Sequence, residues 1–144
     1  MRRKSITRLL TTILALTLIS SCRALNPPES CGLGGYANNT AYGLYIDQVD
    51  LLDVNGGPGE PDRDGLPRFA EGQALNLWLQ IKTDTRMRIC VEETRGGGEI
   101  VFDETTPISA GQSAIALGAL ESGPYIIRLS IDGTLLRNVA FSVR

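Results

Sequence analysis

Five oxygen-bearing side chains lie close together in the sequence and could bind a metal ion. They occupy the Gly- and Pro-rich segment DVNGGPGEPDRDG and are Asp53, Asn55, Glu60, Asp62 and Asp64. Calcium prefers hard oxygen ligands of this kind, so the segment is a candidate calcium site. It does not follow the EF-hand spacing, since Gly57 stands at the fifth position from Asp53. A solvated turn explains the same composition, because Asp, Asn, Gly and Pro all favour turns.

The sequence contains few residues that could act in catalysis. The chain contains no histidine, which excludes Ser-His-Asp and Cys-His catalysis, histidine-based zinc sites and the commonest general base at neutral pH. Asp62 and Asp64 could form an acid–base pair, but a solvated pair in a flexible loop lacks the apolar pocket that such carboxylates need. We therefore expect a protein that is not an enzyme and that has no cofactor other than the candidate calcium ion.

The first residues have the pattern of an export signal. MRRKSITR contains four basic residues and no acidic one, and the uncharged stretch LLTTILALTLISS follows it. A basic start, a short apolar stretch and small residues at its end are typical of a secretory signal peptide. A retained membrane anchor is the alternative, but the stretch is shorter than the roughly 20 residues that cross a bilayer.

The end of this stretch, Leu18-Ile19-Ser20-Ser21-Cys22, resembles the lipobox of bacterial lipoproteins, with Ile19 where leucine is more usual. The resemblance implies a signal peptide over residues 1–21 and a Cys22 that carries a diacylglycerol and a further fatty acyl chain such as palmitate. Each buried methylene contributes about 0.8 kcal/mol, so two or more chains anchor a protein stably. Ordinary secretion with Cys22 as a free thiol is the alternative.

This resemblance places the protein in the bacterial cell envelope, lipid-anchored at the outer membrane or at a periplasmic or extracellular membrane face. With Cys22 lipidated, Cys31 and Cys90 remain as an even pair. Disulfides persist in exported proteins. The bridge would close a loop of 90 − 31 = 59 residues and stabilise the fold by about 4 kcal/mol on the chain-entropy model. Two free thiols are the alternative.

The chain that remains after residues 1–21 is acidic. That segment holds 4 of the 14 basic residues and none of the 16 acidic ones, so the rest carries 10 − 16 = −6 charges. An acidic balance argues against nucleic acid or an anionic lipid surface as a partner. Residues 22–40 are rich in Pro, Gly, Asn and Ser and are interpreted as a tether, and residues 41–144 suit one domain.

The domain has the pattern of short strands. The expected strands are YGLYIDQVDLLDV (42–54), ALNLWLQIKT (74–83), MRICVEE (87–93), IVFDE (100–104), SAIALGAL (113–120), GPYIIRLSID (123–132) and TLLRNVAFSVR (134–144). Several alternate apolar and polar residues, and Asp132-Gly133 is a hairpin signal. About seven strands without a helical period predict an all-β fold, an antiparallel β-sandwich. The alternation turns Cys90 away from the core, so a bridge to Cys31 would hold the tether across the outer side of its sheet.

Two segments, FAEGQALNLWLQIKT and ALESGPYIIRLSIDGTLLRNVAFSV, resemble bacterial immunoglobulin-like and fibronectin-like domains. The matching positions are Leu120, Gly123, Tyr125, Asp132, Gly133, Phe141 and Val143. The resemblance implies an immunoglobulin-like sandwich over residues 41–144. Very many families share this signature, so it specifies no function. The antibody-type arrangement of paired cysteines around a core tryptophan is missing, because Trp78 falls on the polar side of its strand.

Trp78 is the candidate partner-binding residue. With Ile126 as a neighbour, it would mark an apolar patch outside the core, suited to a protein partner or a sugar. Packing of Trp78 beneath the tether is the favoured alternative. The charged residues of the strand around Cys90, namely Arg86, Arg88, Glu92 and Glu93, are interpreted as ordinary solvated surface.

The sequence therefore predicts a membrane-anchored, non-catalytic accessory module of the cell envelope. Its expected partners are the membrane, through the lipid anchor, and an unknown envelope protein, bound through a sheet edge or the face around Trp78. No nucleic acid is expected. The alternative is a calcium-dependent carbohydrate-binding or small-ligand-binding module that uses residues 53–64.

Overall fold

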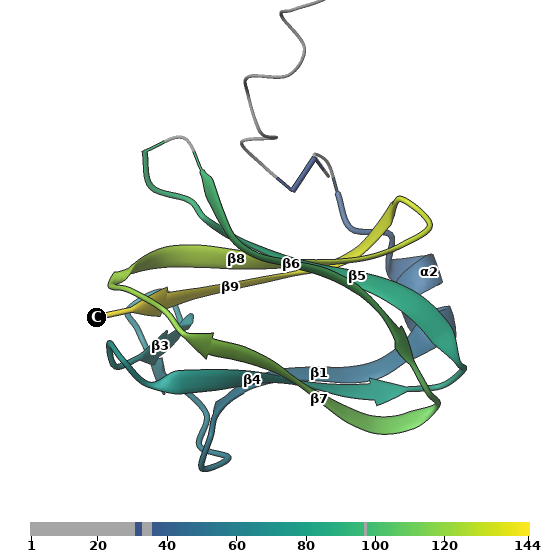
Figure 1. Cartoon of the computed structure of the whole chain (residues 1–144), viewed down its shortest axis with the longest axis horizontal. Coiled ribbons are helices and arrows are strands. Elements are labelled where there is room, and N and C mark those ends of the chain that lie inside the picture. The colour runs from purple at the N-terminus through teal and green to yellow at the C-terminus, as the bar shows by residue number, and fades with distance from the viewer. Residues whose placement is uncertain (1–30, 33–35, 97) are drawn as a thin grey trace, which may run out of the picture.

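The chain folds into a sandwich of two β-sheets with one short helix at one end (Figure 1). The computed structural model describes residues 31–32, 36–96 and 98–144, so the predicted signal peptide, lipobox and Cys22 lie outside the described residues. The elements in chain order are α2 (Asn39–Tyr45), β1 (Ile46–Asp53), β2 (Glu60–Pro61), β3 (Pro67–Phe69), β4 (Ala74–Ile81), β5 (Thr85–Glu93), β6 (Glu99–Ile108), β7 (Gly111–Ala119), β8 (Gly123–Ile131) and β9 (Thr134–Val143).

The smaller sheet has three strands and the larger has six. Their strand orders are β1-β4-β7 and β2-β3-β9-β8-β5-β6. All neighbouring strands are antiparallel except the pair β3 and β9, which is parallel. The chain passes from the larger sheet to the smaller between β6 and β7, which are both edge strands. The predicted all-β sandwich is confirmed, with two short strands, β2 and β3, beside seven long ones.

The core lies between the sheets and comes from the alternation of apolar residues along the strands. In β4, Leu75, Leu77, Leu79 and Ile81 are all buried, as their period of two predicts. Burial of each such side chain stabilises the fold by about 1.5–3 kcal/mol. The β8–β9 hairpin is also confirmed: Asp132 and Gly133 have φ angles of 48° and 78°, as a two-residue turn requires.

Tyr125 ties the connection between β7 and β8 to the core. Its hydroxyl donates a hydrogen bond of 2.8 Å to the Glu121 carbonyl, and its ring stacks on Phe141 with centroids 5.4 Å apart. A tyrosine early in a late strand, bonded to the backbone a few residues upstream, is the tyrosine corner of immunoglobulin-like sandwiches. Gly123, at the start of β8, leaves room for the Glu93 side chain, since a Cβ there would lie 2.8 Å from the Glu93 carboxylate.

We expect Tyr125→Phe to lower the free energy of unfolding by about 1 kcal/mol, or roughly 4–8 °C in melting temperature. The substitution keeps the ring stacking and removes only the hydrogen bond to Glu121. Thermal unfolding measures the effect. Tyr36→Phe is the matched control, because the Tyr36 side chain is fully exposed. Equal melting temperatures for Tyr125→Phe and the unsubstituted protein would contradict the prediction.

The first predicted strand is wrong at its start. The sequence predicts one strand over residues 42–54, whereas Asn39–Tyr45 form α2 and β1 begins at Ile46. Asn38 caps the helix by accepting a 2.9 Å hydrogen bond from the Ala41 amide. The Asn38 amide also donates to Leu135 of β9 at 2.8 Å. Contacts with the sandwich therefore begin before residue 41. None of the described helices is long and apolar enough to cross a membrane.

Candidate functional site

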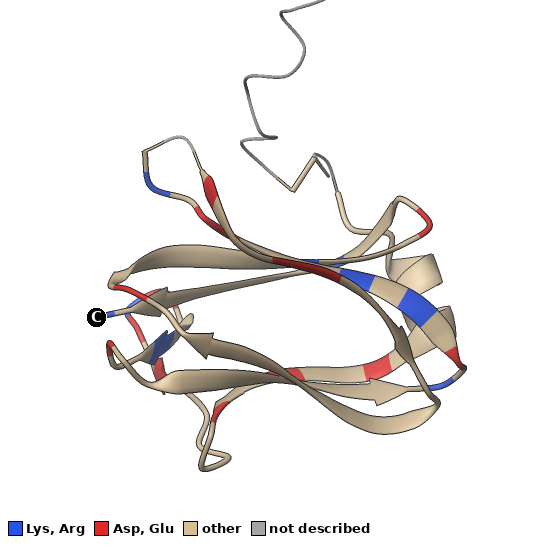
Figure 2. Ribbon diagram, viewed as in Figure 1, with Lys and Arg blue, Asp and Glu red and all other residues tan. Residues whose placement is uncertain are grey.

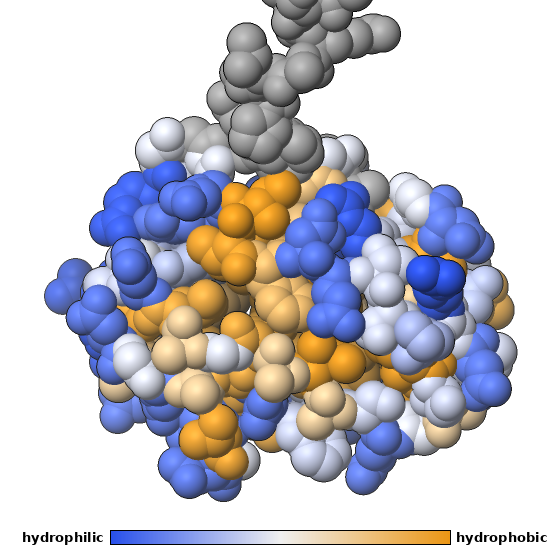
Figure 3. Space-filling model, in the orientation of Figure 1, coloured by the Kyte–Doolittle hydropathy of each residue, from blue (hydrophilic) through white to orange (hydrophobic). Residues whose placement is uncertain are grey.

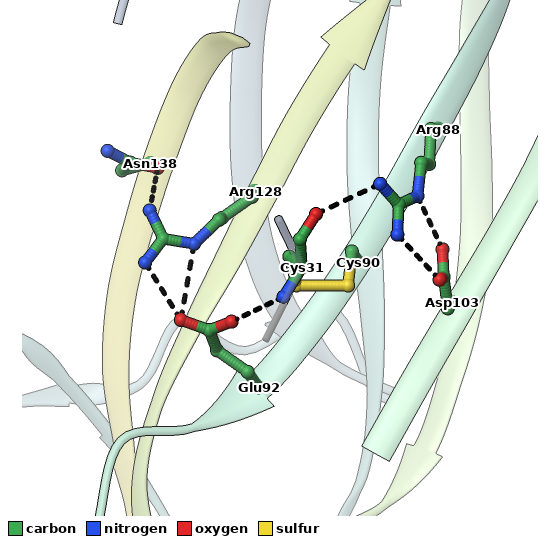
Figure 4. Close-up of a disulfide and its surroundings, with 7 residues drawn as sticks. All are labelled: Cys31, Arg88, Cys90, Glu92, Asp103, Arg128 and Asn138. Carbon is green, nitrogen blue, oxygen red and sulfur yellow. Dashed lines mark hydrogen bonds and ion pairs between the residues drawn. A yellow bond between two sulfur atoms is a disulfide. The ribbon is translucent and has the colours of Figure 1, made fainter. Parts of the chain in front are cut away.

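Cys31 is joined to Cys90 of β5, which confirms the predicted disulfide (Figure 4). The two Cα atoms are 5.9 Å apart. In register, Cys90 lies between Asp103 of β6 and Arg128 of β8, on the outer face of the six-stranded sheet. Both cysteines are nonetheless buried. The chain that enters the domain is therefore fixed covalently against this outer face.

Two charged side chains hold the backbone of Cys31 (Figure 4). The Cys31 amide donates a 2.8 Å hydrogen bond to Glu92 Oε2, and Arg88 Nη1 donates a 2.9 Å bond to the Cys31 carbonyl. Each of these two side chains is itself paired with a residue of opposite charge. Arg128 Nη2 lies 2.8 Å from Glu92 Oε1, and Arg88 binds Asp103 through two bonds of 2.8 and 2.7 Å. We name this group the attachment site; its residues are Cys31, Arg88, Cys90, Glu92, Asp103 and Arg128.

The predicted role of Arg88 and Glu92 as ordinary solvated surface is wrong. Glu92 is only 6% exposed. Burial is the largest influence on this carboxyl and favours its neutral form, but the bonds from the Cys31 amide and from Arg128 outweigh it, so the pKa of Glu92 is lowered. The sequence did hold a signal. A period of two puts residues 88, 90 and 92 on one face, so whatever bridges Cys90 must also cover its neighbours.

The candidate calcium ligands are used by the backbone of two separate turns. Asp53 Oδ1 accepts bonds from the Asn55 and Gly57 amides at 2.7 and 2.8 Å. Asp62 Oδ1 accepts bonds from the Asp64 and Leu66 amides at 2.8 and 2.9 Å. Aspartates in turns commonly bond their own backbone in this way.

Glu60, another acidic residue of the predicted set, pairs with Arg68 across the β2–β3 hairpin at 3.1 Å. In the described part of the chain, no three Asp, Glu, His or Cys side chains are grouped closely enough to hold a metal ion. The hydrogen bond from the Leu66 amide is the main reason that the pKa of Asp62 is lowered. A general acid needs the opposite shift. The hydrogen bonds that Asp53 and Asp62 accept from their own backbone favour the turn interpretation of this segment.

Trp78 lies at the centre of the outer face of the three-stranded sheet. Its side chain is 38% exposed, and in register it stands between Asp50 of β1 and Ala114 of β7. The rows on either side are Gln48-Gln80-Gln112 and Leu52-Asn76-Ala116. We name the residues of these three rows the Trp78 face. A shallow hollow of about 110 Å³ is lined by part of it, including Trp78, Gln80 and Gln112.

The Trp78 face and the attachment site lie on opposite sides of the sandwich. Trp78 belongs to the three-stranded sheet, and Cys90 belongs to the six-stranded one. The predicted packing of Trp78 beneath the disulfide-held tether is therefore wrong. So is the predicted patch with Ile126, since that residue is on β8 of the larger sheet. The alternation of apolar and polar residues predicts which residues point outwards, but only the long-range pairing of strands decides which sheet each residue joins.

The edge strands β6 and β7 border one side of the sandwich. Figure 3 looks onto this side and shows hydrophobic side chains at the surface between the two sheets. Phe102 of β6 and Ile115 of β7 are partly buried against the core, and Val101 of β6 is 39% exposed. Edge strands present unpaired backbone groups to which another strand can bind.

No protein-family model and no curated protein matches the chain. Among solved structures, an immunoglobulin-like protein from Pseudomonas aeruginosa is 15% identical with a TM-score of 0.43; the match covers 69% of this chain and 94% of that one. A β-glucosidase involved in saponin metabolism from intestinal bacteria and a β-D-glucoside glucohydrolase from Trichoderma reesei are 11% and 7% identical, each with a TM-score of 0.36. The match covers 69% of this chain in both cases but only 16% and 18% of those enzymes. At these TM-scores the fold assignment depends on the chain's own strands, register and tyrosine corner.

Proposed function

We propose that this chain is a lipid-anchored protein of the bacterial cell envelope that acts as a non-catalytic binding module. The observation that carries the proposal is the opposition of two faces: the entering chain is fixed to one sheet at Cys31, and Trp78 is exposed on the other. Cys22, the proposed lipid site, lies nine residues before Cys31, a stretch that can reach about 30 Å at most. A domain held in this way turns the Trp78 face away from its anchor.

An envelope protein is the first candidate partner. An exposed tryptophan is the residue most often found at the energetic centre of a protein interface, and the edge strands β6 and β7 could accept a further strand by backbone pairing. A purely structural accessory role would need neither feature. The module would then hold its partner at a fixed, short distance from the membrane.

Ligand binding on the Trp78 face is the second candidate, and the polar residues around the indole favour it. Gln48, Gln80 and Gln112 form one complete row of amides beside it. A calcium-dependent form of this function has little support, because the carboxylates of Asp53 and Asp62 accept hydrogen bonds from the backbone of their own turns.

The lipid anchor is tested by metabolic labelling with radioactive palmitate. We expect the unsubstituted protein to carry the label and to fractionate with membranes, and Cys22→Ser to carry none, because the thioether-linked lipid needs the cysteine sulfur. Cys31→Ser is the matched control: it removes the disulfide but leaves the lipid site, so it should be labelled normally. Palmitate on the Cys22→Ser protein would refute the anchor.

A further inference from the structure

We propose that the Trp78 face binds a short chain of neutral sugars. The proposal deepens the proposed function, since it assumes that this face is the one presented to the envelope. It is carried by three properties of the face, namely its charge, its hydrogen-bonding groups and its shape.

The charge of the three-stranded sheet excludes an anionic ligand. Its strands, β1, β4 and β7, contain no Lys or Arg, whereas the larger sheet carries five arginines: Arg68, Arg86, Arg88, Arg128 and Arg137 (Figure 2). The charged residue of the Trp78 face is Asp50, which accepts a 2.6 Å hydrogen bond from Gln48 Nε2. A carboxylate held beside an amide accepts hydrogen bonds from hydroxyl groups and repels phosphate and carboxylate ligands.

The hydrogen-bonding groups of the face match hydroxyl-rich ligands. Amide side chains both donate and accept hydrogen bonds, as sugar hydroxyls do, and the face has four of them: Gln48, Asn76, Gln80 and Gln112. They lie on both sides of Trp78. Since side chains two apart along a strand are about 7 Å apart, Asn76 and Gln80 span about 14 Å with Trp78 in the middle. That span suits several linked sugars better than a single one.

The shape of the face suits a flat ligand that lies on the surface. The hollow over Trp78 measures about 110 Å³, well below the roughly 300–1,000 Å³ of pockets that enclose a small molecule. Ala114 and Ala116 of β7 keep one flank low, so that a ring can approach the indole. A pyranose ring has a face of C–H groups bordered by hydroxyls. It would place this face on Trp78 and its hydroxyls against the amides.

Apart from its tryptophan, the Trp78 face differs from the usual centre of a protein interface. The centre of a protein interface is an apolar cluster in which aromatic residues, Met and Arg are enriched. Trp78 has instead an aspartate and an alanine as its cross-strand neighbours, Asp50 and Ala114, and the rows beyond hold four amides beside a single large apolar residue, Leu52. A sugar uses each of these groups, so we favour it as the occupant.

The test uses the single tryptophan of the chain, because every change in tryptophan fluorescence then reports this face. The full chain in detergent is titrated with cellotetraose, maltotetraose and the chitin tetrasaccharide, and with tetragalacturonate as the anionic comparison. We expect a saturable fluorescence change with at least one neutral sugar and none with tetragalacturonate. By calorimetry, Trp78→Ala should weaken that binding about tenfold or more, and Gln80→Ala should weaken it less.

Val101→Ala is the matched control, since Val101 has nearly the same exposed fraction as Trp78, 39% against 38%, but lies on the larger sheet. Its sugar binding should be unchanged. Absence of a saturable change with all three neutral sugars, or tighter binding of tetragalacturonate, overturns the sugar proposal. Photo-crosslinking in cells from position 112 of the same face then separates the two proposals. When no sugar binds, a crosslinked protein shows that only the sugar proposal is wrong, and the absence of any crosslinked protein or glycan refutes the binding function of this face as well.

Discussion

Replacing both Cys31 and Cys90 by serine is expected to lower the free energy of unfolding by about 4 kcal/mol. The bridge closes a loop of 59 residues, and the open chain regains that conformational freedom when it unfolds. Removal of the bridge should also weaken the hydrogen bonds of the charged groups around it, since the Cys31 amide is a hydrogen-bond donor to Glu92. Domains of this size are stable by about 5–15 kcal/mol in all, so the variant should unfold at a much lower denaturant concentration.

Denaturant unfolding with and without a reductant measures this effect. The unsubstituted protein should lose stability in reductant and approach the double variant, and the double variant should be unaffected by it. The reductant thus acts as an internal control for the effect of the serine side chains themselves. If alkylation shows that the bridge is open while the unfolding midpoint stays unchanged, the disulfide does not stabilise the domain as we expect.

The outward direction of each strand residue could be predicted from the sequence because alternation is a local property. Leu77 and Met87 are fully buried, as predicted, and Cys90 points to the outer face, where its bridge holds Cys31. The start of β1 could not be predicted in this way. Residues 39–45 form less than two full helical turns, too few for a period of 3.6 to stand out, and the cap at Asn38 is a short-range signal that fits a loop equally well.

The candidate site depended on information that alternation does not contain. Trp78 and Ile126 both point outwards, but they do so from opposite sheets, and only the pairing of distant strands separates them. The same holds for Glu92, whose partners, Cys31 and Arg128, lie 61 and 36 positions away along the chain. The sequence around Glu92, two positions after Cys90, predicts a solvated side chain, whereas the Cys31 amide and Arg128 both bind its carboxylate.

This burial leads to the second large effect: Glu92→Gln is expected to lower the free energy of unfolding by about 2–3 kcal/mol at neutral pH. The glutamine keeps the size of the side chain, but it removes the negative charge of the carboxylate. That carboxylate pairs with Arg128 at 2.8 Å and accepts a hydrogen bond from the Cys31 amide. The loss should depend on pH. Because the folded protein lowers the pKa of Glu92, its ionised form contributes stability above the ordinary carboxyl pKa, and this contribution is lost as the pH falls through the lowered folded value.

Unfolding free energies between pH 7 and pH 3 test both statements. The unsubstituted protein should lose stability steeply below about pH 4.5, where an ordinary glutamate is already about half protonated, and Glu92→Gln should lose less over the same range. Some slope must remain in the variant, because the pKa of Asp103 is also lowered, mainly by its hydrogen bonds from Arg88. Glu104→Gln is the matched control, an exposed carboxylate on neighbouring β6 that should change neutral stability little. Parallel pH curves for Glu92→Gln and the unsubstituted protein would show that the Glu92 carboxylate does not hold the entering chain, and the Cys31–Cys90 bridge and the Arg88 hydrogen bond would then do so without it.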